Sequence, residues 1–342
     1  MWVSIIINNY NYARYLGAAI DSALAQTWRP LEVVVVDDGS TDESWSVIQR
    51  YGQRIRAVRQ ANGGQGAAYN AGFAASRGQW VLFLDADDLL DADALQRMMA
   101  LAAPDVAKVQ GSLRCISAEG RPLGSVVPYV AHDGDVTPIA KRFRHYAAPP
   151  SSGNLFRRSA IEPYLPMPTS VWRYGADTVT IVLSAFHGRV ATVPASIGCY
   201  RLHIGGNRRA GVLGNVNRSL AIALRRTDER AQAVGAWGTQ CSGIEWSDDP
   251  LTPPWDWRSR ALSWRLQPDD HPYPQDDRRS IACGLDASLA TWPGYTMAER
   301  LLQRTWVRFM LSAPRWCVAA LASSNAPGGW RARIKLLRGA RA

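Results

Sequence analysis

Over its first 110 residues the chain alternates short apolar runs with stretches of helical spacing, and this alternation limits the fold more than any other feature. The expected strands are 2–7, 31–36, 55–59 and 80–84. The expected helices are 13–26, 40–49 and 66–76, with Ser40 and Thr41 as N-cap residues of the second. Strands that alternate with helices form a parallel sheet with right-handed crossovers, so we predict a Rossmann-like α/β half.

The second part of the chain has a mixed pattern. Further strands are expected at 106–110, 151–156, 190–193 and 197–200, with a helix at 177–186. Beyond residue 205 we expect a helix at 216–233, an irregular region packed by aromatic side chains at 237–295, and a helix at 298–313. With 342 residues, 47% of them hydrophobic, the chain can bury a sizeable core, which excludes a disordered or fibrous protein.

The net charge of +10 is concentrated near the end of the chain, because residues 300–342 hold nine Lys and Arg and no Asp or Glu. A nucleic-acid-binding protein would spread such a surplus over a folded face, so we expect no nucleic-acid partner. No apolar run approaches the ~20 residues of a membrane-spanning helix, and the run Val3–Ile7 is too short for a signal peptide. Five separated cysteines favour reduced thiols and a cytoplasmic protein.

Three carboxylates, Asp85, Asp87 and Asp88, directly follow the expected strand 80–84. Carboxylates this close repel one another unless a cation neutralises them. Oxygen-rich sites suit Mg²⁺ or Mn²⁺, which in turn hold diphosphate oxygens. The alternative is a helix N-cap, since Asp at a strand-to-helix turn also interacts favourably with the helix dipole.

Two further polar segments follow expected strands. Asp37 and Asp38 end the second strand, where an acid can accept hydrogen bonds from a ribose or a base edge; capping by Ser40 or Asp42 is the alternative. The segment 62–66, Asn-Gly-Gly-Gln-Gly, would let the backbone approach a ligand at a helix start. It contains neither the Gly-x-Gly-x-x-Gly fingerprint nor a P-loop.

Together with Val3–Asn11, these segments closely resemble family 2 glycosyltransferases of the GT-A fold. That family carries V-S-I-I-I-P-x-Y-N, V-V-D-D-G-S-T-D, N-x-G-x-x-x-A-x-N-x-G and L-D-x-D-D in this order, and the third motif is found here at 62–72. The resemblance is specific over 2–92, looser over 145–205 and absent beyond about 210. One departure is Asn8, where the family usually has Pro.

The resemblance implies an α/β protein with a Rossmann-like nucleotide-binding half and a mixed central sheet, followed by a helical and irregular C-terminal extension. Residues 1–110 would bind the nucleotide sugar, 111–210 would hold the acceptor and the catalytic base, and 211–342 would form the Trp-rich extension with its basic tail. The implied activity is a metal-dependent, inverting transfer from a nucleotide-diphosphate sugar to a hydroxyl of a glycan or lipid-linked acceptor. UDP-sugars are favoured as donors, and cell-surface polysaccharide synthesis is the implied process. A non-catalytic nucleotide-sugar or glycan-binding module on the same fold is the alternative.

Site residues follow from the same resemblance. Those implied for the nucleotide sugar are Asn9, Tyr10, Asn11, Asp37, Asp38, Asn62, Gly66, Asn70, Asp85, Ala86, Asp87 and Arg201. Those implied for a Mn²⁺ or Mg²⁺ ion are Asp87, Asp85 and His203, and His203 could instead contact the diphosphate. The other histidines, at 132, 145, 187 and 271, are expected to be structural.

The expected catalytic base is Asp177. About 20 residues after the segment 151–158, the family normally has an acidic pair that opens a helix, and here only the second acid is kept, because Ala176 stands in the first position. One carboxylate is enough to take the proton of an acceptor hydroxyl. The alternatives are that Asp177 only caps the helix and that the loss of the first acid marks a protein without catalysis.

The basic end of the chain suggests a membrane surface. On the helix expected at 298–313, Arg300, Arg304 and Arg308 form one stripe. Leu302, Trp306, Phe309 and Ala313 lie on the opposite side. A basic and aromatic amphipathic helix is typical of an interfacial anchor, so we expect 298–338 to bind an anionic membrane surface at the inner face of the plasma membrane. The alternatives are packing against the chain's own Trp-rich region and a protein partner.

Overall fold

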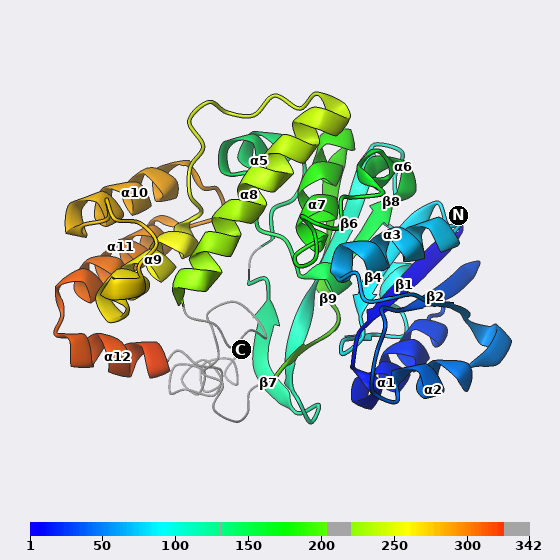
Figure 1. The fold of residues 1–342 in the computed structure, drawn as a ribbon. Helices are drawn as coiled ribbons and strands as arrows, with labels where there is room; N and C mark the ends of the chain where they lie inside the picture. The colour runs from blue at the N-terminus through cyan, green and yellow to red at the C-terminus, as the bar shows by residue number, and fades with distance from the viewer. Residues whose placement is uncertain (130, 204–219, 325–342) are drawn as a thin grey trace, which may run out of the picture.

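The computed structural model describes residues 1–129, 131–203 and 220–324, and a mixed β-sheet forms its centre (Figure 1). The strands are β1 Val3–Asn9, β2 Leu31–Asp37, β3 Arg56–Arg59, β4 Trp80–Asp85, β5 Leu89–Leu90, β6 Val106–Ser117, β7 Pro122–Val127, β8 Asn154–Arg157 and β9 Arg189–Leu202. Their order in the sheet is β3-β2-β1-β4-β8-β6-β9-β5, and β7 pairs with β6. The predicted α/β class is therefore confirmed.

The first half of the sheet is parallel, as the sequence predicts. Strand β1 pairs in parallel with β2 and β4, and β2 pairs in parallel with β3. The helices between these strands are α1 Ala13–Leu24, α2 Ser44–Gln49 and α3 Gln65–Ala75. Alternate side chains of β1 point to opposite faces, so Ile5 packs in the core under α1, whereas Ile6 packs in the core under α3. The carboxyl ends of β1, β2 and β4 consequently meet at one edge.

The predicted N-caps of the second helix are wrong. Helix α2 begins at Ser44, whose backbone N–H donates to Oδ1 of Asp42 at 3.0 Å. The hydroxyl of Ser40 instead accepts from the backbone N–H of Asn11 at 2.9 Å and from Nδ2 of Asn9 at 3.1 Å. Ser40 therefore joins the loops that follow β1 and β2, which leaves its hydroxyl unavailable to the helix.

The second half of the sheet is mixed. Strand β8 lies antiparallel between β4 and β6, and β9 lies parallel to β6. The sequence predicted two strands at 190–193 and 197–200, but β9 is continuous across Pro194, because a shift in register opposite 111–113 accommodates the interruption. The helices of this part are α4 Ala94–Met99, α5 Thr137–Phe143, α6 Arg158–Ile161 and α7 Asp177–Ser184.

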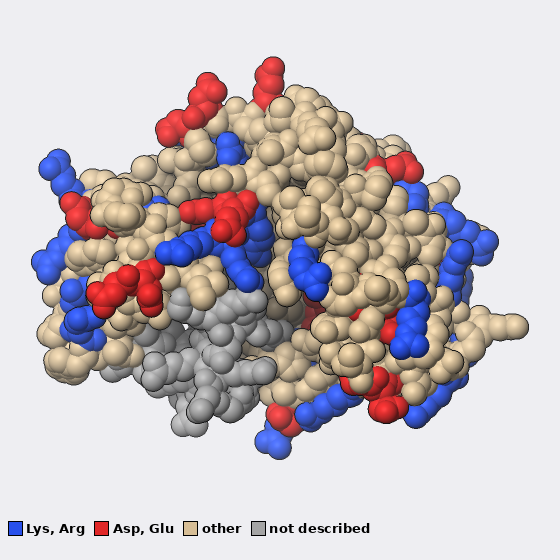
Figure 2. Space-filling view, in the orientation of Figure 1, with Lys and Arg blue, Asp and Glu red and all other residues tan. Residues whose placement is uncertain are grey.

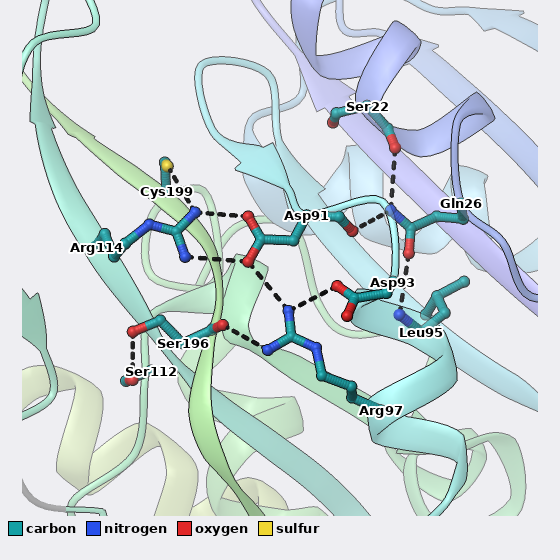
Figure 3. Close-up of polar contacts among 10 residues, drawn as sticks. All are labelled: Ser22, Gln26, Asp91, Asp93, Leu95, Arg97, Ser112, Arg114, Ser196 and Cys199. Carbon is teal, nitrogen blue, oxygen red and sulfur yellow. Dashed lines mark hydrogen bonds and ion pairs between the residues drawn. The ribbon is translucent and has the colours of Figure 1, made fainter.

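A polar cluster centred on Asp91 fastens the segment after β5 to the rest of the sheet (Figure 3). The Asp91 carboxylate accepts from Arg97 at 3.0 Å and from both terminal nitrogens of Arg114 on β6 at 2.5 and 3.0 Å. Its backbone carbonyl accepts from Gln26, and Gln26 also accepts from the N–H of Leu95. These bonds fix the chain immediately after the carboxylates at 85–88.

The C-terminal part is helical. Its helices are α8 Leu220–Ser242, α9 Pro254–Leu266, α10 Arg278–Thr291, α11 Met297–Ser312 and α12 Arg315–Ser324. The helix predicted at 216–233 is found from residue 220 onward, and 216–219 lie outside the described residues. The prediction of an irregular region at 237–295 is wrong, because α9 and α10 lie within it. Buried polar residues on α9, such as Arg260 and Ser263, obscured its helical period.

The basic stripe of α11 faces its own protein. Arg304 and Arg308 donate to the carboxylate of Asp286 on α10 at 2.9 and 2.7 Å. Arg300 donates to backbone carbonyls, including those of Trp292 and Tyr295. Figure 2 likewise shows acidic and basic side chains interspersed over α9–α11 on the face in view. The predicted arrangement, with three arginines free to meet a membrane, is therefore wrong.

The apolar side chains of α11 are divided between core and solvent. Val307 and Leu311 are buried against α9 and α10. Leu302 and Phe309 are exposed by 66% and 51%, and Trp316 on α12 is exposed by 74%. Leu302, Phe309 and Trp316 thus form an exposed apolar stripe on α11 and α12. None of the described helices is both long and apolar enough to cross a bilayer.

Candidate active site

The carboxylates at 85–88 lie at the end of β4 and form a turn before β5. Helix α4 begins only at Ala94, with Asp93 as its N-cap residue. The three carboxylates therefore do not cap a helix, so the alternative reading of this motif is wrong. They lie instead at the edge where the parallel strands end, the usual place for ligands in open α/β sheets.

Three neighbouring elements hold these carboxylates. From β1, Nδ2 of Asn8 donates to Oδ1 of Asp85 at 3.2 Å. From the turn before β8, the hydroxyl of Ser152 donates to Oδ2 of Asp88 at 2.6 Å and accepts from the N–H of Asp85 at 3.1 Å. From β9, the N–H of Arg201 donates to the other oxygen of Asp88 at 2.9 Å. Asp88 is thus a structural anchor, which leaves Asp85 and Asp87 for a ligand.

The electrostatics of the cluster favour a cation. Burial, followed by the charges of Asp87 and Asp177, raises the pKa of Asp85 to about 7. Burial and the same neighbouring carboxylate, Asp87, raise the pKa of Asp88 well above its usual range. A divalent cation would relieve this repulsion, so the residues fit one. Within 1–129, 131–203 and 220–324, no three His, Cys, Asp or Glu side chains form a complete metal site, so a bound ligand would have to supply further donors.

His203 lies directly against this cluster. Its Nε2 is 2.6 Å from Oδ2 of Asp87, and its ring packs beside those of Tyr12 and Tyr15. The sequence resemblance named Asp87 and His203 as metal ligands, and the fold brings them together from β4 and the end of β9. An imidazole and a carboxylate at this distance can share one metal ion or one proton.

Arg201 holds the turn at 85–88 in position. Its Nε donates to the backbone carbonyl of Asp87 at 2.8 Å, and one terminal nitrogen donates to the carbonyls of Ser117 and Ala118. The guanidinium also lies over the ring of Tyr15. These contacts are with the protein itself, whereas the sequence predicted a contact with phosphate.

The loops after β1 and β2 are tied together by amide side chains. Nδ2 of Asn9 donates to Oδ1 of Asp37 at 3.2 Å. Asn11 has a left-handed backbone, with φ of 59°, and its Oδ1 accepts from the N–H of Thr41 at 2.8 Å. Tyr10 between them is exposed by 45%. The predicted nucleoside-binding residues of this loop therefore lie together, with Tyr10 at the surface and Asn9 beneath it.

Asp38 organises the glycine-rich loop. Its two carboxylate oxygens accept from the N–H groups of Gly63 and Gly64 at 2.9 and 2.7 Å. They also accept from the side chains of Gln60 and Asn62. Each oxygen of Asp38 thus has two donors. Oδ2 of the buried Asp37 has no hydrogen bond among the described residues, and its ion-pair partner there is Nε of Arg59 at 3.4 Å.

Other predicted ligand residues contact the protein's own chain. The carboxamide of Asn70 donates to the carbonyl and accepts from the N–H of Met167, both at 2.8 Å. Gly66 donates its N–H to the carbonyl of Trp172 at 2.9 Å, and a Cβ on Gly66 would lie only 2.6 Å from that oxygen. Ala86 is buried. Gly66 and Asn70 therefore fasten α3 to the segment 165–173.

Asp177 is the first residue of α7, and Ala176 occupies the N-cap position without a side-chain bond. Asp177 thus lies one position after the N-cap, in the first turn of α7, where a carboxylate still interacts favourably with the helix dipole. The turn is held instead by Gln65, whose Oε1 accepts from the N–H groups of Gly175 and Ala176 at 2.9 and 3.0 Å. Burial raises the pKa of Asp177, and the charge of Arg230 opposes that rise.

Asp177 also belongs to the carboxylate region, because its charge contributes to the raised pKa of Asp85. Among the described residues, no side chain donates a hydrogen bond to the Asp177 carboxylate. A half-buried carboxylate without such a donor can accept a proton from a bound hydroxyl.

The remaining histidines have structural contacts. Nδ1 of His132 accepts from the N–H of Ala147, and His187 shares a hydrogen bond with the hydroxyl of Tyr164. His145 packs edge-on against Trp255, and His271 is 3.1 Å from Asp276. None of these contacts involves the carboxylates at 85–88.

Sequence reasoning missed three residues that shape the site. Ser152 and Asn8 bind the carboxylates, and Gln65 holds the turn before Asp177. Asn8 was visible only as a departure from the family's Pro, and Ser152 only as part of a small-residue turn. Gln65 carries no signal in sequence, because it acts on residues 110 and 111 positions away.

Comparisons with known proteins agree with this geometry. The family model described as "Glycosyl transferase family 2" matches residues 4–165. An uncharacterised glycosyltransferase from Nostoc sp. is 40% identical over 211 residues, which are 59% of this chain and 65% of the relative. An uncharacterised glycosyltransferase from Rickettsia prowazekii is 46% identical over 87 residues, or 25% of this chain and 27% of the relative. The chain thus spans less than two thirds of the length of either relative.

The fold has a solved counterpart. A crystal structure of residues 1–349 of Staphylococcus aureus TarS in complex with UDP covers 90% of this chain and 90% of its own, with a TM-score of 0.53. The sequence identity is 14%, so the likeness concerns the fold. It extends through the C-terminal helices, which lie outside the part matched by the family model. The GT-A fold that the motifs imply is thereby confirmed.

Proposed function

We propose that the protein is a metal-dependent, inverting glycosyltransferase, because residues 4–165 match the family model described as "Glycosyl transferase family 2". The observation that carries the proposal is the contact of His203 with Asp87 at the strand ends, where the charges of Asp87 and the half-buried Asp177 both act on Asp85. Sugar transfer needs a positive charge at the leaving diphosphate and a base at the acceptor hydroxyl. This site offers residues suited to both tasks.

Asp87 and His203, with Asp85 beside them, would hold Mn²⁺ or Mg²⁺. When bound, the ion supplies Lewis-acid stabilisation of the negative charge that develops on the departing diphosphate. Asn8, Ser152 and Arg201 keep the carboxylates in place through the contacts described above. Their role is to fix the charged oxygens before the ligand arrives, which is the basis of electrostatic preorganisation.

Asp177 takes the proton of the acceptor hydroxyl while that oxygen attacks the anomeric carbon of the donor. The bond from the anomeric carbon to the diphosphate breaks on the opposite face, so the configuration inverts. General base catalysis of this kind typically contributes about 10²- to 10⁴-fold to the rate. Ala176 is buried, so the first acid of the family's pair is replaced by a packing residue, and Gln65 keeps the turn in position.

The nucleotide would lie over the loops after β1 and β2. Asn9, Tyr10 and Asn11 line one side, and Asp37 rather than Asp38 would accept from the base, because both oxygens of Asp38 already have two donors each. A UDP-sugar is the favoured donor, in keeping with the UDP in the TarS crystal structure. The acceptor is a glycan or a lipid-linked sugar, and the process is cell-surface polysaccharide synthesis.

The same protein would work at the cytoplasmic face of a membrane. The support is the exposed apolar stripe of Leu302, Phe309 and Trp316, followed in the sequence by a tail with Arg331, Arg333, Lys335, Arg338 and Arg341 and no acid. Apolar and basic side chains together bind anionic lipid surfaces. Residues 325–342 lie outside the described residues, so this proposal rests on their sequence and on the surface of α11 and α12.

A panel of nucleotides in a thermal-shift assay, with and without Mn²⁺, tests the proposed function. A ligand that binds only the native state raises the melting temperature by mass action. We expect a nucleoside diphosphate to do so with Mn²⁺ and much less without it. A non-catalytic nucleotide-sugar-binding module would give the same shift, and turnover of the nucleotide sugar separates the two possibilities.

A further inference from the structure

Two arginines of α8 lie against the turn that precedes Asp177. The guanidinium carbon of Arg226 is 5.4 Å from the centre of the Tyr174 ring. The side chain of Arg230 crosses Gly175, so that a Cβ added there would be 2.6 Å from its Cδ and 2.9 Å from its Nη1. Gly175 has φ of +74°, and both this backbone and the arginine exclude a larger residue. Arg226 and Arg230 are four residues apart and therefore share one face of the helix.

Neither guanidinium forms an ion pair with a carboxylate of the described chain, although the charge of Arg230 acts on the pKa of Asp177 and of Asp256. No Asp or Glu side chain of the described residues lies within 4.0 Å of the charged nitrogens of Arg226 or Arg230. Arg230 uses its Nε to donate to the carbonyl of Arg226 at 3.0 Å, which orients the planar group and leaves its terminal nitrogens available. By contrast, Arg304 and Arg308 on α11 both donate to Asp286. Arginines without an ion pair also occur elsewhere on the described helices, as Arg258 and Arg265 on α9 show, so the α8 pair is distinguished by its position beside the candidate base.

We propose that Arg226 and Arg230 form a binding subsite for an anionic group of the acceptor, a phosphate or a carboxylate carried near the hydroxyl that is glycosylated. The inference rests on the proposed function, since it takes Asp177 to face the acceptor. Two guanidiniums one helical turn apart offer the forked donors that phosphate and carboxylate oxygens accept best. Because α8 packs on α7, the subsite is positioned relative to Asp177 by helix packing.

The position of the pair indicates selectivity for the acceptor and not for the donor. The two arginines contact Tyr174, Gly175 and α8 itself. The charge of Arg230 also acts on Asp177 and Asp256. The diphosphate would instead be held at Asp85 and Asp87. Helix α8 also lies outside the part matched by the family model. The family's motifs would thus supply the donor site, and this helix would add a preference for charged acceptors.

Titration calorimetry tests the subsite with α-D-glucose 1-phosphate as probe, on protein saturated with UDP and Mg²⁺. Methyl α-D-glucoside serves as the neutral counterpart and glucuronate as the carboxylate counterpart, so the arms separate the two anion chemistries. We expect an anionic sugar to bind more tightly than the neutral one. We expect Arg230→Ala and Arg226→Ala each to weaken binding by about tenfold, the usual effect of losing a charge-assisted bond. Arg230→Lys should retain part of the affinity.

The matched control is Arg225→Ala, which removes the same charge from an exposed position next to the pair. An equal loss in Arg225→Ala would overturn the proposal, because it would reflect net charge alone. Equal binding of the neutral and the anionic sugars by the wild type would also overturn it. A separate UDP titration of the same proteins, before they are saturated with UDP, distinguishes the failures: intact UDP binding without discrimination among the sugars contradicts the subsite only, whereas absent UDP binding contradicts the proposed function.

Discussion

Nε2 of His203 lies 2.6 Å from Oδ2 of Asp87, although the two residues are 116 positions apart in the chain. The contact joins the turn that follows β4 to the residue that follows β9. It places a neutral or cationic imidazole against a carboxylate that has two acidic neighbours. Such a pair is suited to a metal ion held jointly with a diphosphate.

Replacing His203 tests this pairing. We expect His203→Ala to weaken Mn²⁺-dependent binding of UDP by about 10- to 100-fold, the usual effect of removing a group that supports a metal site. The measurement is a UDP titration at fixed Mn²⁺. The matched control is His187→Ala, whose imidazole bonds to Tyr164 outside the site and whose loss should leave the UDP affinity unchanged. Unchanged affinity in His203→Ala would remove His203 from the metal site.

Ser152 should position the carboxylates without touching substrate. Ser152→Ala removes the donor to Asp88 and the acceptor for the N–H of Asp85, so we expect lower turnover with little change in the melting temperature. Because positioning acts on the transition state, kcat should fall more than KM rises. The control is Ser112→Ala, since the hydroxyl of Ser112 shares a hydrogen bond with that of Ser196 at 3.0 Å and none with the carboxylates among the described residues. A rise in KM with an unchanged kcat would contradict a positioning role.

Asp256 predicts a dependence of stability on pH. It is buried at the start of α9, its Oδ2 lacks a partner in the described chain, and burial together with Asp228 raises its pKa to about 7. The folded state therefore binds this proton more tightly than the unfolded state, where the pKa is about 4. The resulting stability is complete below about pH 4 and is lost as the pH rises through 7.

Asp256→Asn should remove that loss. We expect the variant to melt at a higher temperature than the wild type at pH 8, and at an equal or lower one at pH 5, in thermal unfolding at both pH values. Asp270→Asn, an exposed change nearby, serves as the control and should follow the wild type. A higher melting temperature for the wild type than for Asp256→Asn at pH 8 would show that Asp256 is charged and stabilising in the folded protein.

The apolar stripe of α11 and α12 predicts binding to anionic vesicles. We expect Phe309→Ser combined with Trp316→Ser to lower the co-sedimented fraction severalfold, because exposed aromatic side chains insert at the lipid interface. Arg304→Ala should have a smaller effect, since this arginine donates to Asp286. Binding of the wild type should weaken with salt and be absent from neutral vesicles. Equal recovery in the supernatant with and without anionic vesicles would contradict membrane association.

The fold of residues 1–110 could be predicted because its signals are local. Strands β1, β2 and β4 contain continuous apolar runs, and polar clusters follow them, so the sheet and its ligand edge follow from the pattern. Helix α9 was missed because its buried face mixes polar residues such as Arg260 and Ser263 with apolar ones. Helix α10 does carry a helical apolar period, Ile281, Leu285 and Leu289, which the sequence prediction overlooked.

The site was predictable where it rests on motifs and not where it rests on tertiary contacts. Asp87 and His203 could be named from family motifs, and the fold brings them together. The sequence predicted Arg201 as a phosphate ligand, yet its guanidinium bonds to backbone carbonyls whose positions no pattern reveals. Whether a polar side chain meets a ligand or its own backbone is decided by packing between distant segments.

The most direct test of the account is the release of UDP from a UDP-sugar, measured with and without Mn²⁺ for the wild type, Asp87→Asn and Asp177→Asn. Water can replace the acceptor, so slow release needs no knowledge of the natural acceptor. We predict Mn²⁺-dependent release by the wild type and none by Asp87→Asn. For Asp177→Asn, which should still bind UDP, we predict that the rate falls by about 10²-fold or more. A wild type that binds the UDP-sugar with Mn²⁺ and never cleaves it, or an Asp87→Asn variant that cleaves it at the wild-type rate, would contradict the account.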